Sequence, residues 1–263
     1  MTGKLPLEFE TRNKALVERY SRIEDLLSVG ESVSRKLAMK LKRCGNRSHD
    51  CLSAACPKCF RDYRLAILEE LEPIVFSHPR KEEFRIVTLL FFSRMMTDEQ
   101  FAVWDTDNLK RMIKRRFQRC GIETFAVGAL ECDYHTQYGK WLPHLHVLVC
   151  AKETELKSLR RTMRKKESPF VGEGTDRPMK VQRLNNYFSQ ISYLNKTFWT
   201  EVRSLKNRAG KDRQLKFRLD VRRHTLSLVV MDRVGYRGIL IDYPRMRFGS
   251  QLLIKYLSLR RSE

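Results

Sequence analysis

Apolar residues in the first part of the chain recur at helical spacing. Positions three or four apart predict a helical region over residues 11–42, and this spacing is carried by Leu16, Tyr20, Ile23 and Leu27. A second helical run covers residues 60–71. Pro73 and Pro79 follow it, and because proline interrupts regular structure they are expected to bracket a linker.

From residue 83 onward the pattern changes to runs typical of buried strands, rich in β-branched and aromatic residues. It predicts strands over residues 84–92, 124–134, 142–150 and 179–184. Gly139, between the second and third strands, suits a hairpin turn. Helices are expected between and after the strands, over residues 98–120, 153–166 and 186–199. This order predicts an α+β fold with a largely antiparallel central sheet and flanking helices.

The C-terminal part has a different character. Residues 206–223 contain eight Lys or Arg in eighteen positions, which suggests a flexible basic arm. Residues 225–259 alternate around Gly235 and Gly238 and suggest a small hairpin and a final helix. Three regions are therefore expected: a helical N-terminal region over 1–80, a main domain over 81–200 and a basic extension over 201–263.

The charge balance points to a polyanionic partner. Fifty-two Lys and Arg stand against 31 Asp and Glu, a formal net charge of +21. Such an excess repels itself in the compact state, and a nucleic acid partner would relieve that repulsion. A ribosome-associated or membrane-surface protein is the alternative. No stretch reaches the length of a membrane span and the N-terminus lacks an apolar signal-peptide core, so a cytoplasmic protein is expected.

Four of the seven cysteines crowd into one short segment: Cys44, Cys51, Cys56 and Cys59. In a reducing compartment such a cluster favours metal binding over disulfides, and four thiolates can close a structural zinc site. His49 could take the place of Cys51, and free thiols or a redox pair are the alternative. Cys120, Cys132 and Cys150 are scattered and are expected in the core.

A basic helix is expected to precede the fourth strand. Its apolar residues Leu156, Leu159 and Met163 share one side, so Arg160, Arg161, Arg164 and Lys165 face solvent. This face is either simply solvated or a wall that follows a DNA backbone.

The most informative segment is Pro143-His-Leu-His-Val-Leu-Val149. Residues two apart in a strand project to the same face, so His144 and His146 point together and form half of a divalent-metal site. If the preceding strand pairs antiparallel to this one, Glu131 and Asp133 can lie opposite the histidines. Two histidines and a carboxylate suit Mg²⁺ or Mn²⁺. The alternative is a half-exposed polar face without a metal.

His144-Leu-His146 resembles the His–hydrophobic–His motif of the HUH endonuclease superfamily, which includes rolling-circle replication initiators of plasmids and phages. In that family the two histidines hold the divalent metal, often with an acidic residue from the preceding strand. The resemblance therefore implies Glu131 as the third ligand, with Asp133 in reserve. His135 is set aside because it is taken to face away from both carboxylates.

The family's second motif is a helix-borne tyrosine followed by a lysine, and Tyr193-Leu-Asn-Lys196 resembles it. A phenol, with a pKa of about 10, is a weak nucleophile and needs nearby positive charge. Lys196 is expected on the same helix surface as Tyr193. Tyr187 is a rival, and an ordinary helix face is the alternative. Histidines before the tyrosine are typical of initiators rather than conjugative relaxases.

The resemblance extends from residue 44 to residue 197. Cysteine clusters followed by Arg-rich helices, here with Arg61 and Arg64, precede the nicking domain in some plasmid initiators. The resemblance implies a nicking and joining enzyme of a bacterial or archaeal mobile element that forms a 5′-phosphotyrosine. Its expected partners are single-stranded or hairpin DNA at an origin, and possible further partners are a host helicase and polymerase. A transposase of the same chemistry is one alternative. The other is a zinc-containing DNA-binding regulator without catalysis, which leaves the paired motifs unexplained.

Overall fold

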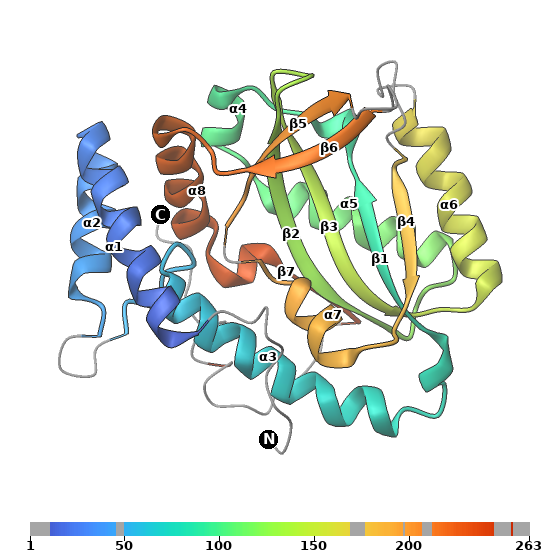
Figure 1. The fold of residues 1–263 in the computed structure, drawn as a ribbon. Coiled ribbons are helices and arrows are strands. Elements are labelled where there is room, and N and C mark those ends of the chain that lie inside the picture. Colours follow the sequence, from blue (N-terminus) through green and yellow to red (C-terminus); the bar gives the residue numbers. More distant parts are fainter. Residues whose placement is uncertain are drawn as a thin grey trace.

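The structure is a computed structural model that describes residues 11–45, 50–168, 177–196, 198–206, 212–244 and 254. Its described part is a mixed α+β fold built on a mostly antiparallel sheet, as predicted. The strands are β1 (Phe84–Leu90), β2 (Phe125–His135), β3 (Lys140–Cys150), β4 (Met179–Arg183), β5 (Glu201–Lys206), β6 (Asp212–Phe217) and β7 (Leu240–Tyr243). They pair in the order β4-β1-β3-β2-β5-β6, and β7 also pairs with β2 (Figure 1). Among the strands of the described residues, only the β2–β5 pairing is parallel.

The β2–β3 hairpin forms the centre of the sheet. Gly139 lies in its turn with a φ of 60°, a backbone conformation that glycine adopts without steric cost. Every residue of β2, and every residue of β3 after Lys140, is buried. Strands covered on both faces contain nearly continuous apolar runs, and such runs allowed these two strands to be predicted from the sequence.

Eight α-helices are present in the described residues: α1 (Arg12–Val29), α2 (Ser32–Arg43), α3 (Pro57–Ser77), α4 (Asp98–Ala102), α5 (Thr106–Arg119), α6 (Glu153–Glu167), α7 (Tyr187–Tyr193) and α8 (Val221–Ile239). Two short 3₁₀ turns occupy Lys81–Glu83 and Phe92–Arg94. In Figure 1, α5 lies behind the sheet and α7 in front of it. The sheet is therefore a middle layer, and its two faces have different neighbours.

Three expectations about helix ends were wrong. Pro73 lies inside α3 rather than in a linker, because the buried face of the helix continues across it from Leu71 to Val75. The helix expected over 98–120 is two helices, since Asp105 caps the start of α5 with a hydrogen bond to the backbone N–H of Asp107 (2.8 Å). The helix expected over 186–199 ends at Tyr193.

The C-terminal part also differs from its prediction. Helix α8 occupies the segment where a hairpin around Gly235 and Gly238 was expected. Gly235 departs from helical geometry (φ 61°, ψ −179°), so it interrupts the helix without reversing the chain. Part of the expected flexible arm is strand β6, and β5, β6 and β7 join the same sheet as the main domain. Apart from residue 254, the expected final helix lies outside the described residues.

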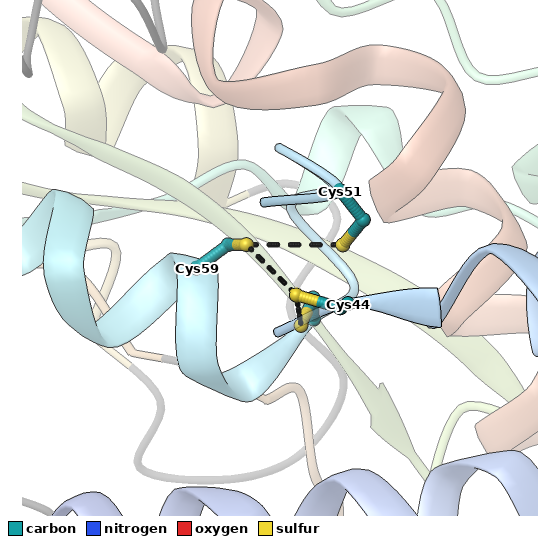
Figure 2. A group of neighbouring side chains, drawn as sticks. Cys44, Cys51 and Cys59 are labelled. Carbon is teal, nitrogen blue, oxygen red and sulfur yellow. Dashed lines mark hydrogen bonds between the residues drawn. The ribbon is translucent and has the colours of Figure 1, made fainter. Parts of the chain in front are cut away.

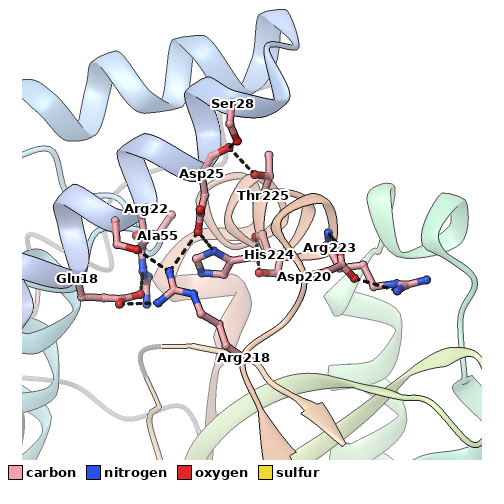
Figure 3. A network of polar contacts seen from close by, with 12 residues as sticks. Glu18, Arg22, Asp25, Ser28, Ala55, Arg218, Asp220, Arg223, His224 and Thr225 are labelled. Atoms are coloured by element: carbon pink, nitrogen blue, oxygen red, sulfur yellow. Dashed lines mark hydrogen bonds and ion pairs between the residues drawn. The ribbon is translucent and has the colours of Figure 1, made fainter.

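A polar network joins α1 to α8 (Figure 3). Asp25 on α1 accepts hydrogen bonds from His224 Nδ1 (2.7 Å) and Arg218 Nη2 (3.1 Å). The buried Arg22 pairs with Glu18 (2.9 Å) and donates to the carbonyl oxygen of Ala55 (2.9 Å). The network therefore ties α1 and the start of α8 to the cysteine segment.

Among the described residues, no helix combines the length and the hydrophobicity that a membrane span needs.

Candidate metal centre and tyrosine site

The β2–β3 register brings the predicted metal ligands together. His144 lies directly opposite Glu131, and His146 follows two residues along on the same face. The Oε2 atom of Glu131 is 3.1 Å from His144 Nε2 and 3.6 Å from His146 Nε2. One ligand atom from each of the three residues lies within 4.8 Å of the others, and all three side chains are buried. These residues could hold a metal ion.

The contacts of the two imidazoles fix their orientation. His144 Nδ1 lies 3.3 Å from the carbonyl oxygen of Leu142, and its Nε2 faces Glu131 Oε2 at 3.1 Å. His146 Nδ1 contacts Thr88 Oγ1 at 2.9 Å. Within the described part of the chain, the buried His146 Nε2 has no hydrogen-bond partner. Electron-rich atoms that converge in this way fit a cation, and the outer bonds orient the ligands as in known metal sites.

Electrostatics keeps His146 and Glu131 in their metal-binding forms. Burial lowers the pKa of His146 to about 3, so its ring is neutral at physiological pH. Burial alone would raise the pKa of Glu131, but Lys196 and the two histidines outweigh this effect and hold its pKa well below the usual value. A neutral imidazole and an ionised carboxylate are the forms that bind divalent metals.

Asp133, the reserve ligand, is engaged elsewhere. It accepts hydrogen bonds from the backbone N–H of Thr200 (2.7 Å) and from Lys216 Nζ (2.6 Å), and its Oδ2 is 3.9 Å from His144 Nε2. The geometry thus favours Glu131 as the third ligand. His135 does not belong to the group either. The expectation that it faces away from the carboxylates was wrong, because strand alternation puts residues 131, 133 and 135 on one side.

Tyr193 lies beside the histidines. Its ring centroid is 5.5 Å from that of His146, and 51% of the side chain's surface is exposed. Tyr187 is instead buried and donates its hydroxyl hydrogen to the carbonyl oxygen of Leu68 on α3 (2.8 Å). Of these two tyrosines, only Tyr193 is both near the candidate metal centre and open to a substrate.

Lys196 lies beyond the end of α7, not on its surface as expected. Its backbone N–H and its Nζ both reach Glu131, at 3.4 and 3.0 Å, which draws the chain out of the helix. The Nζ atom is also 4.4 Å from the centroid of the Tyr193 ring. Its positive charge therefore lies between the carboxylate and the phenol.

The cysteine cluster forms as predicted (Figure 2). Cys44 follows α2, Cys51 lies in the connecting loop, and Cys56 and Cys59 begin α3. The Sγ–Sγ distances are 3.5 Å (Cys44–Cys59) and 3.7 Å (Cys51–Cys59 and Cys44–Cys56). Zn–S bonds of about 2.3 Å in a tetrahedron put sulfurs about 3.8 Å apart, so the cluster is compatible with structural zinc. His49 lies outside the described residues, and the three other cysteines are buried in the core.

Helix α3 connects the cysteine cluster to the tyrosine. Arg64, two turns into α3, donates to the carbonyl oxygen of Ser192, the residue before Tyr193 (2.7 Å). Near the cluster, the hydroxyl of Tyr236 on α8 donates to the carbonyl oxygen of Ser53 (2.9 Å). Arg61, the other arginine singled out, forms an ion pair with Asp62 (3.6 Å). The α3 helix therefore has one end in the cysteine cluster and contacts the end of α7.

The basic face of α6 lies apart from the histidines. Leu156, Leu159 and Met163 are buried as expected, while Arg161, Arg164 and Lys165 are exposed and Arg160 is partly exposed. Glu167 of α6 pairs with Arg116 of α5 (2.7 Å), so α6 belongs to the helix layer opposite α7. These cations are thus not brought to the Glu131–His144–His146 group.

Two residues near the site carried no clear signal in the sequence. Thr88 contacts His146 only because β1 pairs with β3 in the register that places them opposite each other. Lys216 comes from strand β6 and reaches Asp133 across 83 residues of sequence. Both contacts depend on strand pairing that local patterns do not specify.

The site as a whole combines a buried two-histidine, one-carboxylate group with a half-exposed tyrosine and a nearby ammonium group. Comparison of the chain with protein-family models, curated proteins and solved structures gives no match. The chemistry of these side chains is the basis of the function proposed below.

Proposed function

We propose that this chain is a metal-dependent DNA nicking and joining enzyme of the HUH type that acts as a rolling-circle replication initiator. The observation that supports the proposal is the packing of Tyr193 against His146, at a ring distance of 5.5 Å, beside the Glu131–His144–His146 group. The net charge of +21 favours a polyanionic substrate. The substrate is locally single-stranded or hairpin DNA at an origin, and a host helicase and polymerase would act on the product.

In the proposed reaction, the phenol oxygen of Tyr193 attacks a backbone phosphorus atom. A tyrosine–phosphate bond forms and the bond from phosphorus to the 3′ oxygen breaks. The phenol loses its proton and the 3′ oxygen gains one, which gives a 5′-phosphotyrosine and a free 3′-OH. Attack by a 3′-OH reverses the reaction and joins the strands, so no nucleotide cofactor is needed.

The chain's own residues prepare this step. Lys196 places an ammonium group 4.4 Å from the centroid of the Tyr193 ring, where its charge can offset negative charge that develops at the reacting oxygens. His144, His146 and Glu131 would hold Mg²⁺ or Mn²⁺. When bound, the ion supplies positive charge that offsets the negative charge developing on the phosphate oxygens. Thr88 and the carbonyl of Leu142 keep the two imidazoles oriented.

The test is the formation of a covalent protein–DNA adduct. The protein is incubated with Mn²⁺ and single-stranded oligonucleotides, and a denaturing gel detects the adduct. Tyr193→Phe is expected to abolish the adduct and to retain DNA binding. Tyr187→Phe is the matched control, because it removes the same hydroxyl from a buried position of the same helix, and it is expected to retain the adduct.

The other outcomes are equally informative. An adduct that persists in Tyr193→Phe takes this residue out of the nucleophile role. Binding without an adduct in the wild-type protein favours the non-catalytic zinc-containing regulator. Adducts that form at the ends of a transposon rather than at a plasmid or phage origin favour a transposase.

A further inference from the structure

Strand β2 carries two carboxylates on one face, and a lysine from a later segment holds each of them. Lys196 pairs with Glu131 (3.0 Å) and Lys216 pairs with Asp133 (2.6 Å). The two lysines differ in their access to solvent, because the exposed fraction of the side chain is 12% for Lys196 and 44% for Lys216. Of the two ammonium groups, that of Lys216 is the one open to an external polyanion.

Asp133 fixes the position of this ammonium group. Only 3% of its side chain is exposed, one carboxylate oxygen accepts the backbone N–H of Thr200, and the other accepts Lys216 Nζ. That second oxygen is also 3.9 Å from His144 Nε2. A flexible lysine stem is thereby held beside the candidate metal centre by a buried carboxylate.

The geometry of β6 separates Lys216 from Arg213, the other cation of its strand. Lys216 is paired with Val202 of β5 and points to the face from which it reaches Asp133. Arg213, three positions earlier in the same strand, projects to the opposite face because side chains alternate. A lysine ammonium has three donors, and Asp133 engages one, which leaves two for a phosphate.

We infer that Lys216 is a phosphate-binding residue of this site, aimed by Asp133, and that it holds a backbone phosphate of the single strand bound at the Glu131–His144–His146 group. This inference rests on the proposed function for the identity of the ligand. It makes Asp133 a positioning residue rather than a metal ligand. It also gives a specific task to a segment whose composition suggested only a flexible basic arm.

The experiment measures binding of a fluorescein-labelled single-stranded oligonucleotide by anisotropy over a range of NaCl concentrations. Mn²⁺ is present, and every protein carries Tyr193→Phe so that no adduct interferes. Lys216→Gln is expected to weaken binding and to reduce the slope of log K against log[NaCl] by about 0.7, the contribution of one phosphate on a single strand. Lys216→Arg keeps the charge and is expected to restore most of the slope.

Arg213→Gln is the matched control, since it removes one charge from the other face of β6, and it is expected to leave the slope unchanged. A slope that Lys216→Gln does not alter, or that both variants reduce equally, overturns the inference. As a single substitution, Asp133→Asn is expected to reduce the slope. Added to Lys216→Gln, it is expected to reduce the slope no further, and an additive effect contradicts its positioning role. If Asp133→Asn does not fold, the comparison of Lys216 with Arg213 decides.

The result also separates this inference from the proposed function. If binding depends on Lys216 in this way, but the protein that retains Tyr193 forms no adduct, the nicking proposal alone is overturned. A protein that forms the adduct through Tyr193, with a slope that Lys216→Gln leaves unchanged, overturns the inference alone.

Discussion

His224 makes the stability of the fold dependent on pH. This residue is 3% exposed and its Nδ1 lies 2.7 Å from Asp25 Oδ2, in the network that joins α1 to α8 (Figure 3). Burial is the largest effect on its pKa, and Arg22 and Arg218 add to it by disfavouring a second positive charge. Together they outweigh Asp25 and lower the pKa from 6.5 to about 4. The folded protein therefore holds His224 neutral.

The sign and size of the effect follow from this difference in pKa. Above pH 6.5 the histidine is neutral in both states and its contribution to the free energy of unfolding is complete. As the pH falls below 6.5, the unfolded chain takes up a proton that the folded chain does not, so stability is lost until the folded state is also protonated near pH 4. The full difference corresponds to about 3 kcal/mol, and about 2 kcal/mol of it is lost between pH 7 and pH 5.

The assay compares the wild-type protein with His224→Asn by urea denaturation at pH 7 and pH 5. Asparagine keeps an N–H donor toward Asp25 but does not titrate. We expect the wild-type free energy of unfolding to fall between the two pH values by about 2 kcal/mol more than that of the variant. Contributions of groups that do not interact with His224 cancel in this comparison. Equal losses in the two proteins would show that His224 has an ordinary pKa and refute the reasoning.

Three further changes test other parts of the structure. Thr88→Val removes the oxygen that lies 2.9 Å from His146 Nδ1. We expect calorimetry to show that the affinity for Mn²⁺ falls about 10- to 100-fold. Unchanged affinity would mean that Thr88 does not orient the ligand. Cys59→Ser is expected to lose bound zinc, measured by mass spectrometry of the metal content, and to lower the melting temperature. The control Cys120→Ser is expected to keep the zinc. Equal zinc in both proteins would exclude the cysteine cluster as its site. Gly128→Ala places a methyl group 2.0 Å from the carbonyl oxygen of His146, so we expect a loss of about 1–3 kcal/mol or more in urea denaturation, and unchanged stability would contradict the close approach of β2 to β3.

Much of the central sheet could be predicted because its signals are local. The alternation of side chains puts His144 and His146 on one face, and a hairpin with Gly139 in its turn brings Glu131 opposite them. Spacing within one short segment was enough to predict the cysteine cluster. In these cases the residues that must meet are close in sequence, so the backbone geometry of one or two elements decides the outcome.

The remaining features depend on contacts between distant segments. Pro73 is tolerated because tertiary packing continues on both sides of it, which overrides the local preference against proline in a helix. Gly235 was taken as a turn signal, yet it only kinks α8, which continues beyond it. Lys216 meets Asp133 and β7 pairs with β2 only after the chain has returned to the sheet. No local pattern marks such pairings.

The position of β7 has a consequence for how the chain is made. Ala126–Ala129 of β2 pairs with Leu240–Tyr243, so on the ribosome this stretch of β2 lacks its second neighbour until more than a hundred further residues have emerged. During that interval the nascent chain presents an apolar edge with unpaired N–H and C=O groups. We expect fragments that stop before residue 240 to aggregate or to recruit chaperones, and soluble expression to require synthesis of the complete α8–β7 segment.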